Sequence, residues 1–379
     1  MLRNLFSDNQ SQSPWLRMTV ILLGVALIYL VLIYGKFVLM PLAFSALLAM
    51  LLEPVSRLFE RLKAGRALSI VLSMVVVFIG LAGIFSLLSI QFIQFRERLP
   101  EVNERLRDIS SEILSFFQQN FGISPGQQVD FVQQGLGDII NRSGEALSTA
   151  VGATTSAFVT LGLLPIFVFF LMYYKDMYRN FLHMITKEGS NRSIDTVIND
   201  IQLVTQNYIV GLISVIGILA VLNGIGFWAI GLENALFFGV FAAIWAIIPY
   251  IGIIIGSLPA FLFAFLFTDS LFMPLGVIGV IAIVQFLEGN FITPNIVGSK
   301  VSINPFASIL ALIIGGEVWG ISGMILFVPF LGILRSIFVA VDGLEPYGYL
   351  LGTQQAYDVE QEQKEKPDPV SEVQPDSSV

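Results

Sequence analysis

The chain has 379 residues, of which 55% are hydrophobic and only 13% charged, and its formal net charge is −8. Soluble domains carry about 25% charged residues, whereas the apolar residues here form blocks long enough to cross a bilayer core of about 30 Å. The composition therefore excludes an ordinary soluble domain and predicts an integral membrane protein. Because the chain has no cysteine and a single histidine, His183, it excludes disulfides, thiolate metal sites and cysteine nucleophiles, and we expect no metal and no cofactor.

Long apolar stretches predict six membrane spans. They cover residues 18–34, 37–52, 67–92, 151–174, 208–232 and 271–287. Two further apolar regions, residues 235–267 and 306–341, are interrupted by Gly and Pro. The sequence leaves open whether each of these regions crosses the membrane twice or enters it and returns. We therefore expect an all-α, polytopic membrane protein with about eight transmembrane helices, some of them broken or re-entrant.

Basic residues orient this set of helices. Lys and Arg concentrate in the short loop at residues 57–66 and in the interval 175–192, and the positive-inside rule places such loops in the cytoplasm. The N- and C-termini are then also cytoplasmic, and the interval 95–150 lies outside. Apolar residues at three- and four-residue spacing in this interval predict a helical hairpin. They are Leu99, Val102, Leu106, Ile109, Ile113 and Phe116.

The organisation has four parts. They are N-terminal membrane helices at 1–94, an extracytoplasmic helical hairpin at 95–150, a C-terminal membrane core at 151–351 with a cytoplasmic loop at 175–207, and a cytoplasmic tail at 352–379. The tail is rich in Pro, Ser and acidic residues, a composition that predicts disorder.

The first unusual stretch in the core is "AIIPYIGIIIGSLPAF". Pro249, Gly252, Gly256 and Pro259 lie at a depth where a regular helix is expected, and proline removes a backbone donor and disrupts the helical ladder. Irregular backbone in a membrane is tolerated where it is buried in protein or lines a wet cavity. We predict a helix break or hinge here. The alternative is plain helix packing, because Gly252 and Gly256 form a small-xxx-small pair.

The second stretch is "QFLEGNFITPN". A carboxylate within the hydrocarbon costs at least about 2.5–3.5 kcal/mol, so Glu288 needs an explanation. Four polar residues lie close to it in the sequence: Gln285, Asn290, Thr293 and Asn295. Of these, Gln285 and Asn290 are its expected hydrogen-bond partners, and Gly289 and Pro294 loosen the helix. A broken helix beside a carboxylate is how membrane proteins assemble proton or cation sites. The alternative is a glutamate at the membrane interface, in contact with water.

The third stretch is "ILALIIGGEVWGISG". The apolar run before Gly315 and Gly316 is too short to span a bilayer, and a long apolar run follows. This pattern predicts a re-entrant hairpin that enters from the cytoplasmic side and turns at "GGEVWG", with Glu317 at its tip. The alternative is that both segments cross fully and Glu317 lies in water outside.

Enzymatic motifs are not found in the sequence. It has no HExxH zinc motif, no GxSxG nucleophile elbow and no aspartate-rich diphosphate site. Nor does it carry a nucleic-acid signature, so we expect neither an enzyme nor a nucleic-acid partner.

Three motifs, in order, resemble those of the AI-2E family of bacterial transporters, also described as autoinducer-2 exporter-like or PerM-like permeases. "PYIGIIIGSLPA" resembles the family's P-x-x-G-x-x-x-G-x-x-P element, and "QFLEGNFITPNIVGSKVSINP" its Glu-x-Asn-x-x-x-Pro element followed by Asn-Pro. "GGEVWGISGMILFVP" resembles its final glycine-rich stretch. The matching positions include Glu288, Asn290, Pro294, Asn304, Pro305, Gly315, Gly316 and Glu317.

The resemblance implies a multi-pass permease of the bacterial inner membrane, oligomeric, that exports a small polar solute such as autoinducer-2. The stretches around Pro249, Glu288 and Gly315 would line its pathway, and Glu288 would couple transport to protons. An alternative that uses the same site is a sodium or lithium/proton antiporter. A second alternative is a scaffolding membrane protein, for which the outer hairpin is the best support. Expected partners are the solute, H⁺ or Na⁺, the lipid bilayer and further copies of the chain.

Overall fold

A computed structural model describes residues 14–97, 162–185, 194–248, 251–268, 272–298, 303–341 and 343–354. Within these ranges the chain is helical apart from turns and one isolated β-bridge, which confirms the all-α class. Nearly all of the predicted outer hairpin, the start of the predicted span at 151–174, Pro249 and the tail beyond residue 354 lie outside the described residues.

The helices follow the predicted order. They include α2 (Pro14–Tyr34), α3 (Lys36–Arg61), α4 (Arg66–Glu97), α7 (Lys175–Ile185), α8 (Ile194–Ala229), α9 (Ala235–Trp245), α10 (Ile251–Phe267), α11 (Phe272–Leu287), α13 (Pro305–Trp319), α14 (Ile321–Ala340) and α15 (Glu345–Leu351). A further apolar helix covers Gly162–Tyr173, before α7. Two π-helical segments, η1 (Glu288–Ile292) and η2 (Pro294–Gly298), continue α11. Five helices of the described part are long and apolar enough to cross a membrane, as a polytopic membrane protein requires.

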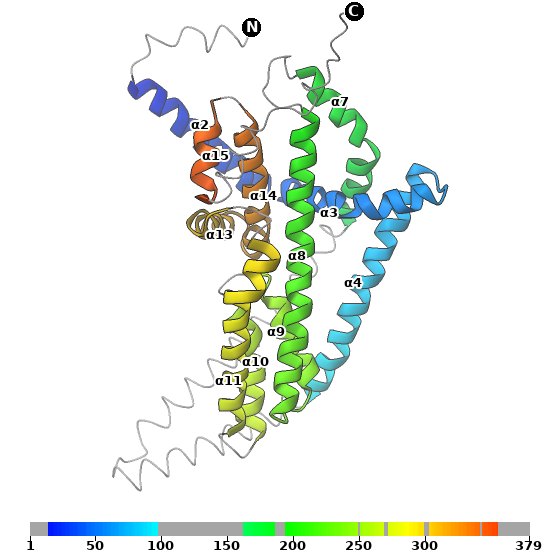
Figure 1. Cartoon of the computed structure of the whole chain (residues 1–379), viewed down its shortest axis with the longest axis vertical. Coiled ribbons are helices and arrows are strands. Elements are labelled where there is room, and N and C mark those ends of the chain that lie inside the picture. Colours follow the sequence, from blue (N-terminus) through cyan, green and yellow to red (C-terminus); the bar gives the residue numbers. More distant parts are fainter. Residues whose placement is uncertain are drawn as a thin grey trace, which may run out of the picture.

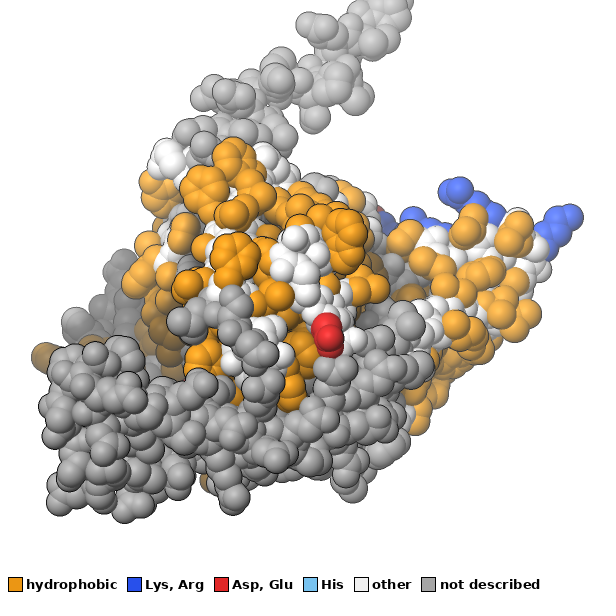
Figure 2. All heavy atoms as spheres, turned by 90° about the horizontal axis from the view of Figure 1, so that it is seen from below, with side chains coloured by type: hydrophobic (Ala, Val, Ile, Leu, Met, Phe, Trp, Pro, Cys, Tyr) orange, Lys and Arg blue, Asp and Glu red, His pale blue; other side chains and the backbone are white. Residues whose placement is uncertain are grey.

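Helix α8 is the axis of the molecule. It has 36 residues, which gives a length of about 54 Å, so it extends well beyond the predicted span at 208–232. In Figure 1, α9, α10 and α11 gather beside its lower half, α13, α14 and α15 beside its upper half, and α3 crosses it near the top. Seen from below, hydrophobic side chains cover most of the described surface, while Lys and Arg side chains emerge at one edge (Figure 2). An apolar surface of this extent is suited to contact with lipid.

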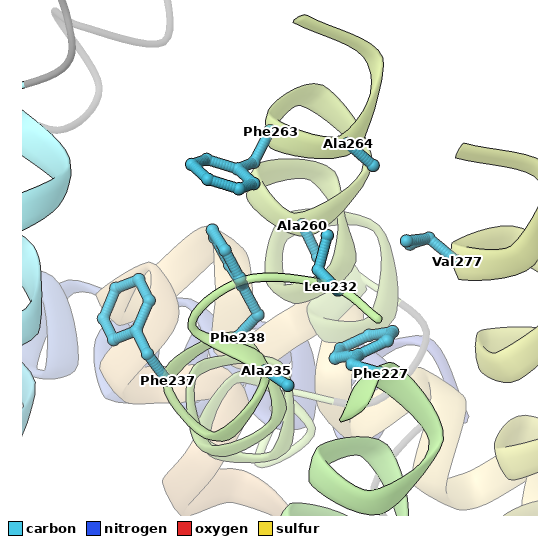
Figure 3. Close-up of a cluster of buried hydrophobic side chains, with 9 residues drawn as sticks. All are labelled: Phe227, Leu232, Ala235, Phe237, Phe238, Ala260, Phe263, Ala264 and Val277. Atoms are coloured by element: carbon cyan, nitrogen blue, oxygen red, sulfur yellow. The ribbon is translucent and has the colours of Figure 1, made fainter. Parts of the chain in front are cut away.

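The interrupted region at 235–267 forms a helical hairpin with a short first arm. Helix α9 has 11 residues and reaches only about 16 Å, too short for a bilayer core of about 30 Å. The chain leaves the helix after Trp245 and comes back as α10. Phe238 of α9 and Phe263 of α10 face each other with ring centroids 5.2 Å apart (Figure 3). This contact and the approach of Gly252 to Trp245 show that the two helices are antiparallel. Residues of α8 and α11 complete the same apolar core.

Gly252, Gly256 and Pro259 were predicted to break the helix, but all three lie inside α10. The helix is interrupted between Trp245 and Ile251, an interval of the sequence that includes the fourth predicted position, Pro249. A Cβ atom on Gly252 would lie 1.8 Å from the carbonyl oxygen of Trp245, and one on Gly256 would lie 2.8 Å from Cα of Ala242. The two glycines therefore let α10 lie directly against the backbone of α9, as the helix-packing alternative expected.

A similar correction applies to the second interrupted region. Helix α13 runs through Gly315 and Gly316 to Trp319, and the chain turns at Gly320, whose φ of +61° suits glycine. Gly315 instead packs against α14, because a Cβ atom there would lie 2.4 Å from the carbonyl oxygen of Gly323. The predicted turn is thus at the last glycine of "GGEVWG", and the first two glycines serve helix contact.

Replacing Gly252 with Ala should destabilise the α9–α10 hairpin. The new methyl group has no room beside Trp245, and such overpacking costs about 1–3 kcal/mol. The melting temperature of the purified protein, followed by tryptophan fluorescence, should fall. Gly279→Ala in α11 is the matched control, because a Cβ atom there meets nothing within 4 Å. Equal melting temperatures for the two variants would contradict the assignment.

Candidate functional site

The segment after Leu287 stays helical but changes its pitch. Helix α11 passes without a break into η1 and then η2, which together cover most of residues 288–298. The loosening expected from Gly289 and Pro294 thus takes the form of π-helix, in which hydrogen bonds join residues five apart. Such turns are rare and occur frequently at functional sites.

Both carboxylate oxygens of Glu288 accept a hydrogen bond. Gln285 donates to Oε2 through Nε2 at 2.7 Å, and the Thr293 hydroxyl donates to Oε1 in a short hydrogen bond. Glu288 is half-buried. Two donors satisfy part of the hydrogen-bonding capacity of the carboxylate in a segment where charge is costly. The result is a polar site built by a single stretch of chain.

The partners of Glu288 differ in part from those the sequence suggested. Gln285 lies where it was expected, but Asn290 is exposed and donates to the backbone oxygen of Phe286 at 2.8 Å. Asn295 is exposed as well. Thr293 takes the predicted place of Asn290, because a π-helical turn brings residue i+5 onto the face of residue i. The five-residue spacing from Glu288 to Thr293 can be read from the sequence. Only the π-helical pitch brings the two side chains into hydrogen-bonding contact.

The π-helical segment meets the end of α9 near the middle of α8. Ile292 and Ile296 pack against a small apolar cluster that includes Val215 and Leu219 of α8 and Ala243 of α9. The end of α9, where the α9–α10 hairpin turns, and the Glu288 segment therefore lie at the same level of the molecule. Two of the three irregular stretches singled out in the sequence come together there.

The third stretch is held by another helix. Trp319, at the end of α13, donates through Nε1 to the carbonyl oxygen of Leu32 in α2 at 2.9 Å. Glu317 is exposed on the same helix. The contacts of the described residues thus attach this hairpin tip to α2, and they do not join Glu317 to Glu288.

The Asn-Pro pair that follows the Glu288 motif starts α13. Asn304 accepts a hydrogen bond at Oδ1 from the backbone N–H of Ala307 at 2.8 Å, with Pro305 as the first helical residue. Its Nδ2 donates to the carbonyl oxygen of Leu350 at 2.7 Å. One asparagine therefore caps α13 and fastens α15 to its start.

The two basic loops lie next to each other. Arg66 binds Asp176 at 2.6 Å, which links α4 to α7, and Arg179 binds Asp195 at 2.6 Å, which links α7 to α8. The hydrogen bond and negative charge of Asp195 raise the pKa of Arg179. Both loops therefore lie at the same end of the molecule, which is what the charge pattern predicts.

A buried carboxylate in α3 escaped the sequence reasoning. Glu53 is only 7% exposed and accepts hydrogen bonds from Arg57 Nε at 2.9 Å and from Lys175 Nζ at 2.5 Å. The pairing of Glu53 with Arg57 at four-residue spacing could have been found. Its second partner, Lys175, lies 122 residues away and becomes a neighbour only in the folded protein.

Comparison with known proteins agrees with the resemblance of the motifs. The model of the AI-2E family transporters matches residues 18–342. The chain belongs to the AI-2E transporter family. It is 29% identical over 317 residues to YrrI of Bacillus subtilis, covering 80% of this chain and 86% of that protein. To YhhT of Escherichia coli K12 it is 24% identical over 325 residues, covering 83% and 88%. The names of both relatives describe transport proteins and state no substrate.

Membership in this family, together with five apolar helices of spanning length, makes the chain a multi-pass membrane transport protein. The Glu288 segment carries one of the three motifs by which the family was recognised. Of the irregular stretches in the described part, it is the one in which a carboxylate meets side-chain donors.

Variants with a single introduced cysteine should show whether the Glu288 segment is accessible to water. The chain has no cysteine of its own, and maleimides react with the thiolate, which forms in water and is disfavoured in apolar surroundings. Asn290→Cys and Asn295→Cys should react with a membrane-impermeant maleimide several times faster than Ile283→Cys, which is exposed on the apolar part of α11. Equally slow labelling of all three variants in nanodiscs would show that lipid, and not water, surrounds the segment.

Proposed function

We propose that the protein exports a small polar solute, of the autoinducer-2 type, along a path that passes the Glu288 segment. The observation that carries the proposal is the carboxylate of Glu288, with Gln285 and Thr293 as donors, placed beside the end of a re-entrant hairpin. Amide, hydroxyl and carboxylate groups in an otherwise apolar core suit a hydroxylated solute. In transporters, substrate sites are formed by discontinuous helices near the membrane midplane.

Proton coupling belongs to the same proposal. Ionisable residues inside membrane segments are expensive and commonly form proton relays. Among the described residues between Asn234 and Leu334, Glu288 and Glu317 are the acidic ones. Glu317 is exposed on α13. Glu288 is therefore the group proposed to take up and release the proton, with the hairpin end as the element that responds to its charge.

The alternative of sodium or lithium/proton exchange uses the same carboxylate. It would need several oxygen ligands around one point. In the described part of the chain, the donors that meet Glu288 are an amide N–H and a hydroxyl, which satisfy the carboxylate directly. This geometry favours a hydrogen-bonded solute or proton over a bare cation.

The proposed setting is the inner membrane of a bacterium, with both termini in the cytoplasm and several copies of the chain assembled together. The adjacent basic loops support this orientation through the positive-inside rule. The extensive apolar surface, which includes the largely exposed helix α2, offers area for an interface between copies of the chain.

Replacing Glu288 with Gln should abolish the proton-coupled part of the flux. Glutamine keeps the shape of the side chain and removes its titration. Export of autoinducer-2 would be measured in proteoliposomes with and without an imposed proton gradient. Glu233→Gln, an exposed carboxylate in the turn between α8 and α9, is the control and should transport like the original protein.

Flux through Glu288→Gln with unchanged pH sensitivity would exclude the coupling role. The same vesicles separate the two transport hypotheses. A pH-sensitive dye inside them should respond to sodium or lithium only if the protein is a cation/proton antiporter.

Thr293 offers a matched pair of variants. Thr293→Ser keeps the hydroxyl that donates to Glu288, whereas Thr293→Val keeps the shape and removes the donor. A lost hydrogen bond to a charged group costs about 1.5–3 kcal/mol, so the valine variant should transport at least several-fold more slowly and the serine variant close to normally. Equal flux through both variants would show that the hydroxyl has no part in transport.

A further inference from the structure

A pocket of about 600 Å³ opens between the C-terminal half of α3 and the first turns of α8. This volume is in the range of sites that bind small molecules. Its lining comes from one face of each helix. The residues are Glu53, Pro54, Arg57, Leu58, Arg61, Asn199, Gln202, Leu203 and Gln206. The lining of α8 ends before the predicted span at 208–232, so the pocket lies toward the side of the basic loops.

The charge of the lining is positive. Arg57 and Arg61 carry two positive charges, and the single carboxylate, Glu53, already binds both Arg57 and Lys175. Because Arg57 reaches Glu53 through Nε, its terminal guanidinium nitrogens keep their donors for another partner. Within the described residues, the pocket therefore has more cationic donors than acceptors.

Polar side chains of α8 complete the lining. Gln206 donates to the carbonyl oxygen of Met50 at 2.7 Å, which fixes α3 against α8 and sets the width of the pocket. Gln202 and Asn199 lie one and two turns nearer the start of α8, and in the described part of the chain the side chains of Gln202, Asn199 and Arg61 form no hydrogen bond. The pocket thus presents two guanidinium groups and two amides that a ligand can engage.

We propose that this pocket binds a phosphate group. Guanidinium groups bind oxyanions with two parallel hydrogen bonds, and phosphate offers enough oxygens for Arg57, Arg61 and the amides together. Two sources share this chemistry: a phosphorylated solute from the cytoplasm and the headgroup of an anionic lipid. Leu58 and Leu203 are each 56% exposed at the rim, where an acyl chain could lie. The proposal concerns binding and does not depend on what the Glu288 segment transports.

Binding can be measured calorimetrically on the full-length protein in detergent, at constant ionic strength set with KCl. Two matched pairs of probes separate the sources. Glucose 6-phosphate is compared with glucose, and dioctanoyl phosphatidylglycerol with dioctanoylglycerol. At least one phosphate-bearing probe should bind while its phosphate-free match does not. Binding of glucose 6-phosphate identifies a soluble ligand, and binding of the phospholipid alone identifies a headgroup site. Phosphate-bearing and phosphate-free probes that bind alike, or not at all, would overturn the proposal.

The variants test the residues. Arg61→Gln removes an exposed lining charge and should weaken binding about tenfold or more, as expected for a lost charge-assisted hydrogen bond. Gln202→Ala should weaken it less. Lys63→Gln removes the same charge from the neighbouring loop outside the lining and should bind like the original protein. If Lys63→Gln weakens binding as much as Arg61→Gln, the effect is one of general basic charge and the pocket assignment is wrong.

Discussion

A chain inside a bilayer must satisfy its backbone hydrogen bonds within the protein, because hydrocarbon offers no partner. Each irregular stretch of this protein is a solution to that constraint. Where α9 ends after 11 residues, α10 returns so closely that Gly252 touches the carbonyl of Trp245. Where α13 turns into α14, Gly315 and Gly323 approach in the same manner. Glycine permits these contacts because a Cβ atom at either place would overlap the neighbouring backbone.

The Glu288 segment meets the same constraint in a different way. Its backbone remains hydrogen-bonded as π-helix, so the helix continues without an interruption that would leave backbone carbonyls unpaired in the hydrocarbon. The wider turn changes which side chains share a face, and Thr293 reaches the carboxylate as a result. A change in backbone pitch thus assembles a polar site without a gap in the helix. The adjoining hairpin end then gives that site a neighbour that is not a continuous helix.

Charge is distributed according to its cost. Buried ions need several partners, and Glu53 has two cations, one of them from the distant α7. The ion pairs of Arg66 and Arg179 join α4, α7 and α8 at the same end. At the opposite end of α8 the contacts are apolar, with Phe227, Phe238 and Phe263 in one core. At the charged end, ion pairs join the helices where contact with water lowers the desolvation cost of the charges. At the aromatic end, the apolar core holds the α9–α10 hairpin against α8.

The sequence by itself determined the membrane class, the helical architecture and the family, because composition, span length and three ordered motifs are local properties of the chain. It also singled out Glu288 with Gln285. Tertiary structure alone decided which glycines break helices and which bring them together, since a close approach is defined by a partner that the local sequence does not contain. It likewise determined that Thr293, and not Asn290, donates to Glu288, because the pitch of the helix sets which residues share a face. The pocket beside Arg61 depended on it entirely, as its two walls are more than a hundred residues apart in the chain.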